Sequence, residues 1–328
     1  MERNTNIEIL RIAAIVFVVI GHLCKWHNQQ FGCAEIETYP ITNSGVDIFI
    51  IITGYWGIKP SLNKVVSLLV TMFYYGIVSV LILYLLGSLS FLDLLVNLLK
   101  AFWIFSGWWF MLSYLALFLF SPLLDYLLQQ IEKIRNFYIV VFAFIDFVVQ
   151  TNTDGFYGLS VFGGALLHFI VLYLIGRELN LRNIRCKYSS LVFVIVTIIL
   201  FVLNTKGFES YFLIAGKDTS PLVVVQSVSL LMMAFSGPQI HVAWINKIAS
   251  FAFPVYLLHA SAGGVLAIKT LLVSKIITDS CICDIFLCAI IIYLVSLPID
   301  MIRIWLCSPI QCYLISHVNK DIFKQFKK

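Results

Sequence analysis

Long apolar runs that recur from one end of this chain to the other constrain its fold more than any other feature. A helix that crosses the hydrocarbon core of a bilayer needs about 20 mostly apolar residues, and these runs have that length without the alternation of a membrane strand. Hydrophobic residues make up 61% of the 328 positions and charged residues only 12%, unlike a soluble domain. We therefore predict an all-α fold, a polytopic membrane helical bundle of about ten transmembrane helices. The predicted spans are approximately 6–25, 44–58, 64–87, 106–128, 135–150, 159–178, 189–204, 220–236, 247–271 and 282–306.

The distribution of lysine and arginine predicts the orientation of the bundle. With a cytoplasmic N-terminus, 15 of these residues fall in segments on the inner side and six on the outer side, in accord with the positive-inside rule. An even number of spans and a basic end, NKDIFKQFKK, then place both termini in the cytoplasm. This bias accounts for the net charge of +5, so the charge gives no reason to expect nucleic-acid binding.

No linker or change of composition divides the chain. We expect one membrane domain over residues 1–328, with a basic cytoplasmic tail from about residue 308. No separate soluble domain is visible, so the helices and their short loops would have to carry any chemistry.

Two polar residues in the first run carry the strongest functional signal. Arg11 and His22 are eleven residues apart, which is about three helical turns and roughly 16.5 Å along the axis, so they share one face of a helix. Glu8 lies three residues before Arg11, where it can form an ion pair with it. A charge within the membrane is costly, which favours a functional role; snorkelling of Arg11 and an interfacial place for His22 are the alternative.

The second run, NSGVDIFIIITGYWG, places Asp47 in the first turn of a helix that begins near Ser44. A carboxylate there can interact favourably with the helix dipole. Asp47 could also orient His22 from beside the outer end of the first helix. Thr53-Gly54 near the end of this run allows a neighbouring helix to approach closely.

Aromatic and polar residues mark three later runs. Trp108 and Trp109 begin the fourth span, where tryptophan usually forms an interfacial belt. His168 with Tyr173, and Tyr256 with His259, are further intramembrane polar groups, and isolated histidines of this kind more often pack and hydrogen-bond than carry protons. No carboxylate-rich set suggests a metal ligand group, so we expect no metal.

Taken in order, these segments resemble the acyltransferase family 3 of integral-membrane O-acyltransferases. The resemblance rests on the Arg11 and His22 pair, the GVD-aromatic second span that ends in Thr53-Gly54-Tyr55, the WFMLSYL stretch with SPLL after it, and the late VYLLH. It covers nearly the whole chain. Glu8 stands where many members have aspartate, and Thr53 where serine is commoner.

The resemblance implies an enzyme of the bacterial cytoplasmic membrane that uses acetyl-CoA from the cytoplasm to acetylate a cell-envelope, capsular or exported polysaccharide. His22 would be the base or the acyl acceptor, and Asp47 would orient it. Trp108 or Trp109 would stack on a sugar of the acceptor, which is a polysaccharide or its lipid-linked precursor. No tightly bound cofactor is implied, because acetyl-CoA is a substrate. The expected donor-binding residues are Arg11, Arg177, Arg182 and Arg185.

A transporter or flippase of a sugar or a lipid-linked substrate is the alternative function, because such proteins also place arginine, histidine and aspartate along an intramembrane path. Matching halves with paired broken helices would favour transport. The sequence shows only one short span, 44–58, without a counterpart.

Overall fold

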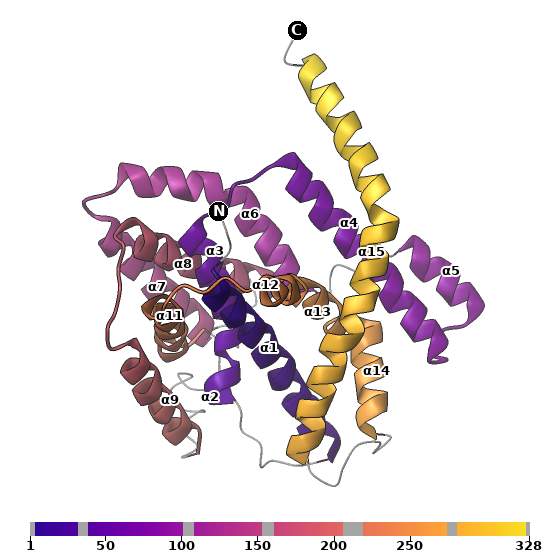
Figure 1. Cartoon of the computed structure of the whole chain (residues 1–328), viewed down its shortest axis with the longest axis horizontal. Helices are drawn as coiled ribbons and strands as arrows, with labels where there is room; N and C mark the ends of the chain where they lie inside the picture. Colours follow the sequence, from indigo (N-terminus) through magenta and orange to yellow (C-terminus); the bar gives the residue numbers. More distant parts are fainter. Residues whose placement is uncertain are drawn as a thin grey trace. The chain divides into compact units, whose positions relative to one another are not determined.

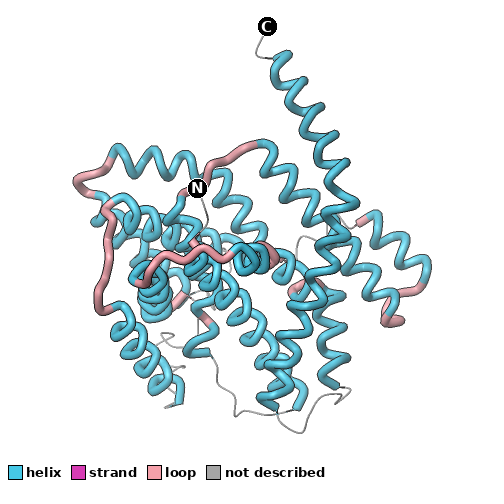
Figure 2. The backbone as a smooth tube through the Cα atoms, in the orientation of Figure 1, coloured by secondary structure: helices cyan, strands magenta, loops and turns pink. Residues whose placement is uncertain are grey.

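The computed structural model describes residues 4–31, 39–100, 108–152, 161–205, 219–273 and 281–325. Within these ranges the ordered elements are all helices, joined by short loops and turns, and no strand is present (Figures 1 and 2). The all-helical fold is therefore as predicted. The helices are α1 Thr5–Phe31, α2 Tyr39–Thr42, α3 Ser44–Trp56, α4 Leu62–Leu85, α5 Phe91–Leu99, α6 Trp109–Gln130, α7 Arg135–Asn152, α8 Val161–Leu181, α9 Ser189–Thr205, α11 Pro221–Ser236, α12 Ala243–Ala249, α13 Ala252–His259, α14 Ala262–Val273 and α15 Cys281–Gln325.

Among the described residues, four helical segments are long and apolar enough to cross a membrane. A fifth span results if the broken pair formed by Ala243–His259 and Ala262–Leu271 counts as one. Helices α9 and α11 are apolar but shorter than these four segments, and α3 has only 13 residues. The number of ten spans and the cytoplasmic termini therefore stay predictions. The four segments are Thr5–Trp26, Leu62–Leu85, Trp109–Gln130 and Cys283–His317.

Three helical features go beyond the predicted spans. The ninth run is not one helix, because its axis turns by 86° at the break between His259 and Ala262. The last helix, α15, does not stop near residue 306 but continues through Pro309 to Gln325. A short helix, α5, follows α4, and its Ser90 cap forms a capping box with Asp93. The hydrogen bonds from Ser90 lower the pKa of the exposed Asp93 carboxyl below its ordinary value.

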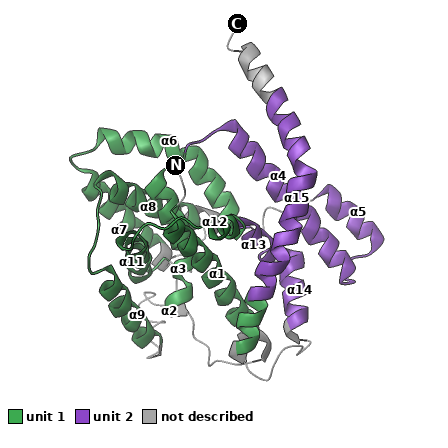
Figure 3. Cartoon of the chain, in the orientation of Figure 1, with its two compact units in different colours: residues 1–58, 109–252, 280–289 green, residues 59–108, 253–279, 290–328 purple. Residues whose placement is uncertain are grey.

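The chain forms two compact units that alternate along the sequence (Figure 3). The first unit comprises residues 1–58, 109–252 and 280–289, and the second comprises residues 59–108, 253–279 and 290–328. The candidate site described below lies in the first unit.

In the first unit, α3 packs against α1, α8 and α11. Three glycines allow these helices to approach within backbone contact. A Cβ atom on Gly45 would lie 2.7 Å from the carbonyl oxygen of Ala14 in α1, and one on Gly54 would lie 2.4 Å from that of Tyr173 in α8. Gly176 of α8 faces α3 in the same way, with Ile51 O at 2.4 Å. The prediction that Thr53-Gly54 marks a close helix approach is confirmed.

In the second unit, α14 packs against α4 through Gly263. A Cβ atom at Gly263 would lie 2.2 Å from the carbonyl oxygen of Ser79. The amide of Gly263 donates to the Ser79 hydroxyl at 2.9 Å, and the amide of Gly264 donates to the Ser261 hydroxyl at 3.0 Å. These bonds satisfy amides that the break before α14 would otherwise leave without a partner in an apolar setting.

The crossing of α3 and α8 predicts a large effect of a single methyl group. Gly54→Ala or Gly176→Ala should destabilise the folded chain by about 1–3 kcal/mol, because the new Cβ can be accommodated only if two backbones separate. Thermal unfolding of the detergent-solubilised chain would measure this. Gly237→Ala is the matched control, since its Cβ would meet only Asn6 Nδ2 at 3.6 Å. Equal melting temperatures for all three variants would contradict the prediction.

Candidate active site

Arg11 and Glu8 form an ion pair on the first two turns of α1. Arg11 Nη1 donates to Glu8 Oε1 at 2.7 Å, as the three-residue spacing predicts. The Glu8 side chain is 5% exposed and the Arg11 side chain 31% exposed. The second carboxylate oxygen, Glu8 Oε2, is buried without a hydrogen-bond partner. The pair thus has a buried anionic end and an accessible cationic end.

Tyr114 of α6 is within hydrogen-bonding range of the Thr53 side chain of α3 and interacts electrostatically with Arg11 of α1. Thr53 itself donates to the carbonyl of Phe49 at 2.8 Å. Tyr114 was not among the predicted site residues, although it is the tyrosine of the WFMLSYL stretch.

His22 lies on the same continuous helix as Arg11, because α1 runs unbroken from Thr5 to Phe31. The predicted spacing of about three turns is therefore retained. The His22 ring lies beside Trp26, with ring centroids 5.5 Å apart and planes tilted by 32°. The roles predicted for Arg11 and His22 stay predictions.

Asp47 of α3 contacts a different histidine from the predicted one. Its Oδ1 lies 3.2 Å from Nε2 of His168 in α8, and the other ring nitrogen, Nδ1, lies 2.6 Å from Oδ2 of Asp146 in α7. All three side chains are buried. That Asp47 orients His22 stays a prediction. The signal for the missed Asp146 is a lone carboxylate in the apolar stretch FAFIDFVVQ.

Arg177, one of the predicted donor-binding residues, is fixed at the end of α8. Its Nε donates to Asp125 Oδ1 of α6 at 2.8 Å, and the Tyr173 hydroxyl donates to the same oxygen at 2.9 Å. Gly57 ends α3 with a φ of +72°, and a Cβ there would lie 3.0 Å from Arg177 Nη1. The guanidinium thus lies directly against the backbone that leaves α3.

Arg182, the second of these residues, shares a carboxylate with an arginine that the predicted set omits. Glu178 Oε2 lies 2.5 Å from Arg135 Nε, and Glu178 Oε1 pairs with Arg182. Arg135 is buried, whereas the Arg182 side chain is 43% exposed. One carboxylate therefore serves two guanidinium groups, which leaves a local excess of positive charge.

Arg185, the third, lies over two aromatic rings. Its Nη2 donates to the Tyr55 hydroxyl at 2.9 Å, and its guanidinium carbon lies 4.3 Å from the centroid of the Phe235 ring. Cation–π contact holds the group while leaving it exposed to solvent. Arg177, Arg182 and Arg185 are thus all in the first unit, near the C-terminal ends of α3 and α8.

The two tryptophans predicted to stack on a sugar differ in exposure. Trp108 is 1% exposed, so its ring has no open face. Trp109 is half-buried, and its ring centroid lies 6.1 Å from that of Phe169. Of the two, Trp109 is the better placed for stacking, and that role stays a prediction.

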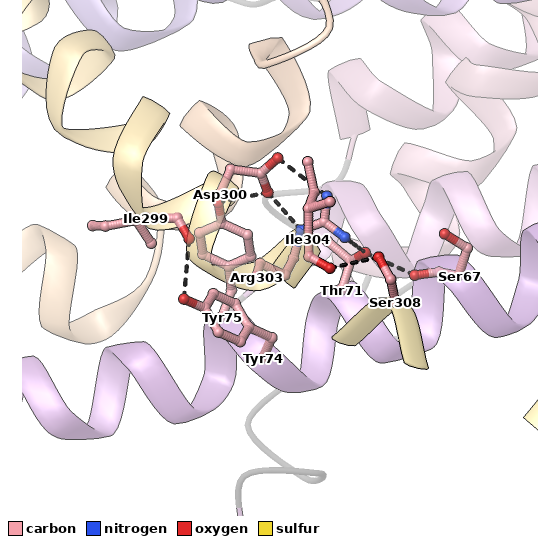
Figure 4. Close-up of polar contacts among 9 residues, drawn as sticks. All are labelled: Ser67, Thr71, Tyr74, Tyr75, Ile299, Asp300, Arg303, Ile304 and Ser308. Carbon is pink, nitrogen blue, oxygen red and sulfur yellow. Dashed lines mark hydrogen bonds and ion pairs between the residues drawn. The ribbon is translucent and has the colours of Figure 1, made fainter. Parts of the chain in front are cut away.

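The second unit holds its own ion pair, formed by Asp300 and Arg303 of α15. Arg303 Nε and Nη2 donate to the two oxygens of Asp300 at 2.5 and 3.1 Å, and Nη1 donates to the Thr71 hydroxyl at 3.2 Å (Figure 4). The Tyr75 hydroxyl donates to Asp300 Oδ1 at 3.1 Å. Since these bonds join α4 to α15 and use both carboxylate oxygens, the cluster is suited to holding two helices together.

Tyr256 and His259, the predicted intramembrane polar pair of the second unit, are also buried. His259 is fully buried, its Nδ1 lies 2.9 Å from the carbonyl oxygen of Val255, and its ring lies against Tyr256. Across the described residues, no three His, Cys, Asp or Glu side chains come together as a group that could hold a metal ion.

The fold and these clusters define a helical membrane protein with charged side chains paired inside apolar helices. A family model described as an acyltransferase domain matches residues 4–301, which is nearly the whole chain. The chain belongs to this acyltransferase 3 family, whose name indicates acyl transfer as its chemistry. Comparison with curated proteins and with solved structures gave no match.

The Arg11–Glu8 geometry predicts that loss of Arg11 has a structural component. Arg11→Ala should lower the free energy of unfolding by roughly 1–3 kcal/mol, because it leaves a buried carboxylate without its partner. Glu8→Gln in the same chain should restore most of that stability without restoring Arg11 function. Thermal unfolding of the wild type, the two single variants and the double variant gives the coupling free energy between Glu8 and Arg11. If the effects of the two substitutions on stability simply add, the prediction is wrong.

Proposed function

We propose that this chain transfers an acetyl group from cytoplasmic acetyl-CoA to a hydroxyl group of a cell-envelope, capsular or exported polysaccharide. The observation that carries the proposal is α1, where an accessible, ion-paired Arg11 lies about three turns from His22 in a chain of the acyltransferase 3 family. The intramembrane charge has a cost that a purely structural helix would avoid. Family membership supports this function over the transporter or flippase alternative.

The inner arginines support an anionic, nucleotide-containing donor. Around the ends of α3 and α8, three guanidinium groups share two carboxylates, Asp125 and Glu178, and a fourth, that of Arg185, donates to the Tyr55 hydroxyl. Arginine is suited to phosphate because its planar donors can bind two oxygens at once. Arg182 and Arg185 are the accessible members of this set, so they would contact the phosphates of CoA. Arg11 would meet the donor nearer the reacting thioester.

His22 would act as the general base. Its imidazole takes the proton of the acceptor hydroxyl as that oxygen attacks the thioester carbonyl carbon, and the C–S bond then breaks. The CoA thiolate leaves with the proton that the imidazolium returns. In the covalent variant of this scheme, His22 first accepts the acetyl group itself and the sugar hydroxyl attacks the acetyl-imidazole. Arg11, about three turns from His22 on the same helix, would bind the pantetheine or phosphate part of CoA and not the reacting carbonyl.

The acceptor would be held by an aromatic side chain. Trp109 is half-buried at the start of α6, and a sugar face can pack on such a ring. The acceptor is a polysaccharide or its lipid-linked precursor.

Complementation tests this function directly. A deletion strain should lose the O-acetyl signal of its envelope or exported polysaccharide, and only the wild-type chain, not His22→Ala or Arg11→Ala, should restore it. The purified glycan would be examined by proton NMR at matched protein levels. The Glu8→Gln/Arg11→Ala double variant controls for the stability effect described above.

An unchanged O-acetyl signal in the deletion strain would overturn the proposal for the glycans examined. Restoration by His22→Ala would instead overturn the role of His22 while leaving the function intact. Recovery of a labelled acetyl group on the denatured protein in the absence of acceptor would identify the covalent variant.

The accessible arginines predict a selective effect on donor binding. Arg185→Gln should raise the KM for acetyl-CoA roughly tenfold with little change in kcat, because the group contacts the donor far from the reacting atoms. Steady-state kinetics of the purified chain with a soluble acceptor would measure both constants. Lys133→Gln, which removes an exposed charge from the turn before α7, is the matched control. An equal change in both variants would indicate a general effect of charge.

A further inference from the structure

A buried cluster of one histidine and two aspartates in the first unit is not used by the mechanism above. The ring of His168 in α8 lies between Asp146 of α7 and Asp47 of α3, at 2.6 and 3.2 Å from the two ring nitrogens. The relative exposures are 2% for the histidine and 3% and 0% for the two aspartates. Three helices therefore meet at a group that water reaches poorly.

The geometry fixes how many protons the group must hold. The short contact with Asp146 uses one N–H of the ring. A neutral imidazole would then turn a lone pair toward Asp47, which an ionised carboxylate at 3.2 Å would repel. For both contacts to be hydrogen bonds, either the ring is an imidazolium, or it is neutral and one of the two aspartates carries a proton. An imidazolium between two carboxylates satisfies both contacts with N–H donors and leaves the group with one net negative charge.

The surrounding helices supply the other charges that bear on this group. α11 contributes no titratable side chain. The arginines on α1, α7 and α8 pair with Glu8, Asp125 and Glu178, so His168 is the group that can supply a positive charge in contact with Asp47 and Asp146. Besides Asp146 and His168, the titratable groups whose side chains are described on α1, α6, α7 and α8, together with Arg182 just after α8, are Glu8, Arg11, His22, Cys24, Lys25, Tyr114, Asp125, Tyr126, Arg135, Tyr138, Tyr173, Arg177, Glu178 and Arg182.

We propose that His168 is a positioning residue of the acyl-transfer site, and that it acts by keeping Asp47 ionised and fixed in orientation. This inference rests on the proposed function and on the role predicted from the sequence for Asp47, which is to orient the base His22. Only an ionised Asp47 can accept a hydrogen bond from His22 and stabilise the imidazolium that forms there. Asp146 holds the His168 ring in place through Nδ1, in the way a supporting carboxylate orients a functional histidine.

Infrared difference spectroscopy tests the electrostatic part without any activity assay. Wild-type chain in lipid vesicles at pH 7 should show no C=O stretch of a protonated carboxyl group that depends on Asp47. His168→Gln, which keeps a hydrogen-bonding side chain but removes the positive charge, should show such a band, and His168→Gln/Asp47→Asn should lose it. A band in the wild type that disappears in Asp47→Asn would overturn the inference. So would a His168→Gln chain whose new band persists in the double variant, since Asp146 would then be the group that takes the proton.

The pH dependence of kcat/KM tests the functional part. Because activity requires ionised Asp47, His168→Gln should move the acid limb to higher pH by roughly one unit or more and lower kcat/KM about tenfold or more at pH 7. Activity should recover as the pH rises, which a merely structural loss would not show. His317→Gln, an exposed histidine at the far end of α15, is the matched control. A uniform loss at all pH values, or an unmoved acid limb, would overturn the inference.

The two experiments separate this inference from the proposed function. If the chain transfers no acetyl group, no pH profile can be measured and the proposed function is wrong. The infrared result still decides whether His168 keeps Asp47 ionised. If His168→Gln does not fold, the ring ¹⁵N resonances of His168 in the wild-type chain decide instead. Two protonated nitrogens at pH 7 are expected, and a neutral ring would overturn the inference.

Discussion

The close approach of α3 and α8 is the contact on which the rest of the candidate site depends. Gly54 and Gly176 let the two backbones meet where any side chain would separate them. Without that approach, residues of α3 could not reach their partners on α8 and in the segment after it, because the hydrogen bonds between them span only 2.9–3.3 Å. Along this one seam lie the pairs Asp47 with His168, Ile58 with Tyr173, Gly57 with Arg177 and Tyr55 with Arg185. Van der Waals packing of small residues is the usual means of association between membrane helices, since lipid removes the hydrophobic driving force between them.

Pairing of charge follows from the same apolar environment. An isolated ion among apolar helices is costly, and a carboxylate from another helix reduces that cost while fixing the geometry. Glu178 serves Arg135 and Arg182, Asp125 serves Arg177, and Glu8 serves Arg11. The second unit follows the same rule with Asp300 and Arg303. The pairs of Arg135 with Glu178 and of Arg177 with Asp125 join different helices, so they specify helix position as well as charge.

The sequence predicts the elements better than it predicts the partners. Apolar length located a helix in every predicted span, and the three-residue spacing of Glu8 and Arg11 predicted a bond that stays within one helix. Contacts between helices depend on rotation and depth, which no local pattern contains, so Asp146 and Arg135 were missed as partners. The break before α14 was missed as well, because hydrophobicity along an apolar run does not show whether the helix bends or continues. Its local signal is Ser261 followed by Gly263 and Gly264, a cap and two residues that fit close to α4 and to the preceding turn.

The pairing pattern also separates arginines that hold the fold from arginines that can bind a ligand. Arg303 gives Nε and Nη2 to Asp300 and Nη1 to Thr71, and its side chain is 14% exposed, so little of its donor capacity is left. Arg11 gives one N–H to Glu8 and is 31% exposed, which leaves guanidinium donors directed at accessible space. A ligand anion can add to such a half-used guanidinium without breaking the ion pair that keeps it in place. The same reasoning favours Arg182 and Arg185 over Arg135, because burial makes the charge of Arg135 available only to Glu178 and to the neighbouring backbone. Family membership indicates the chemistry, and the unused donors indicate where a negatively charged substrate can be held.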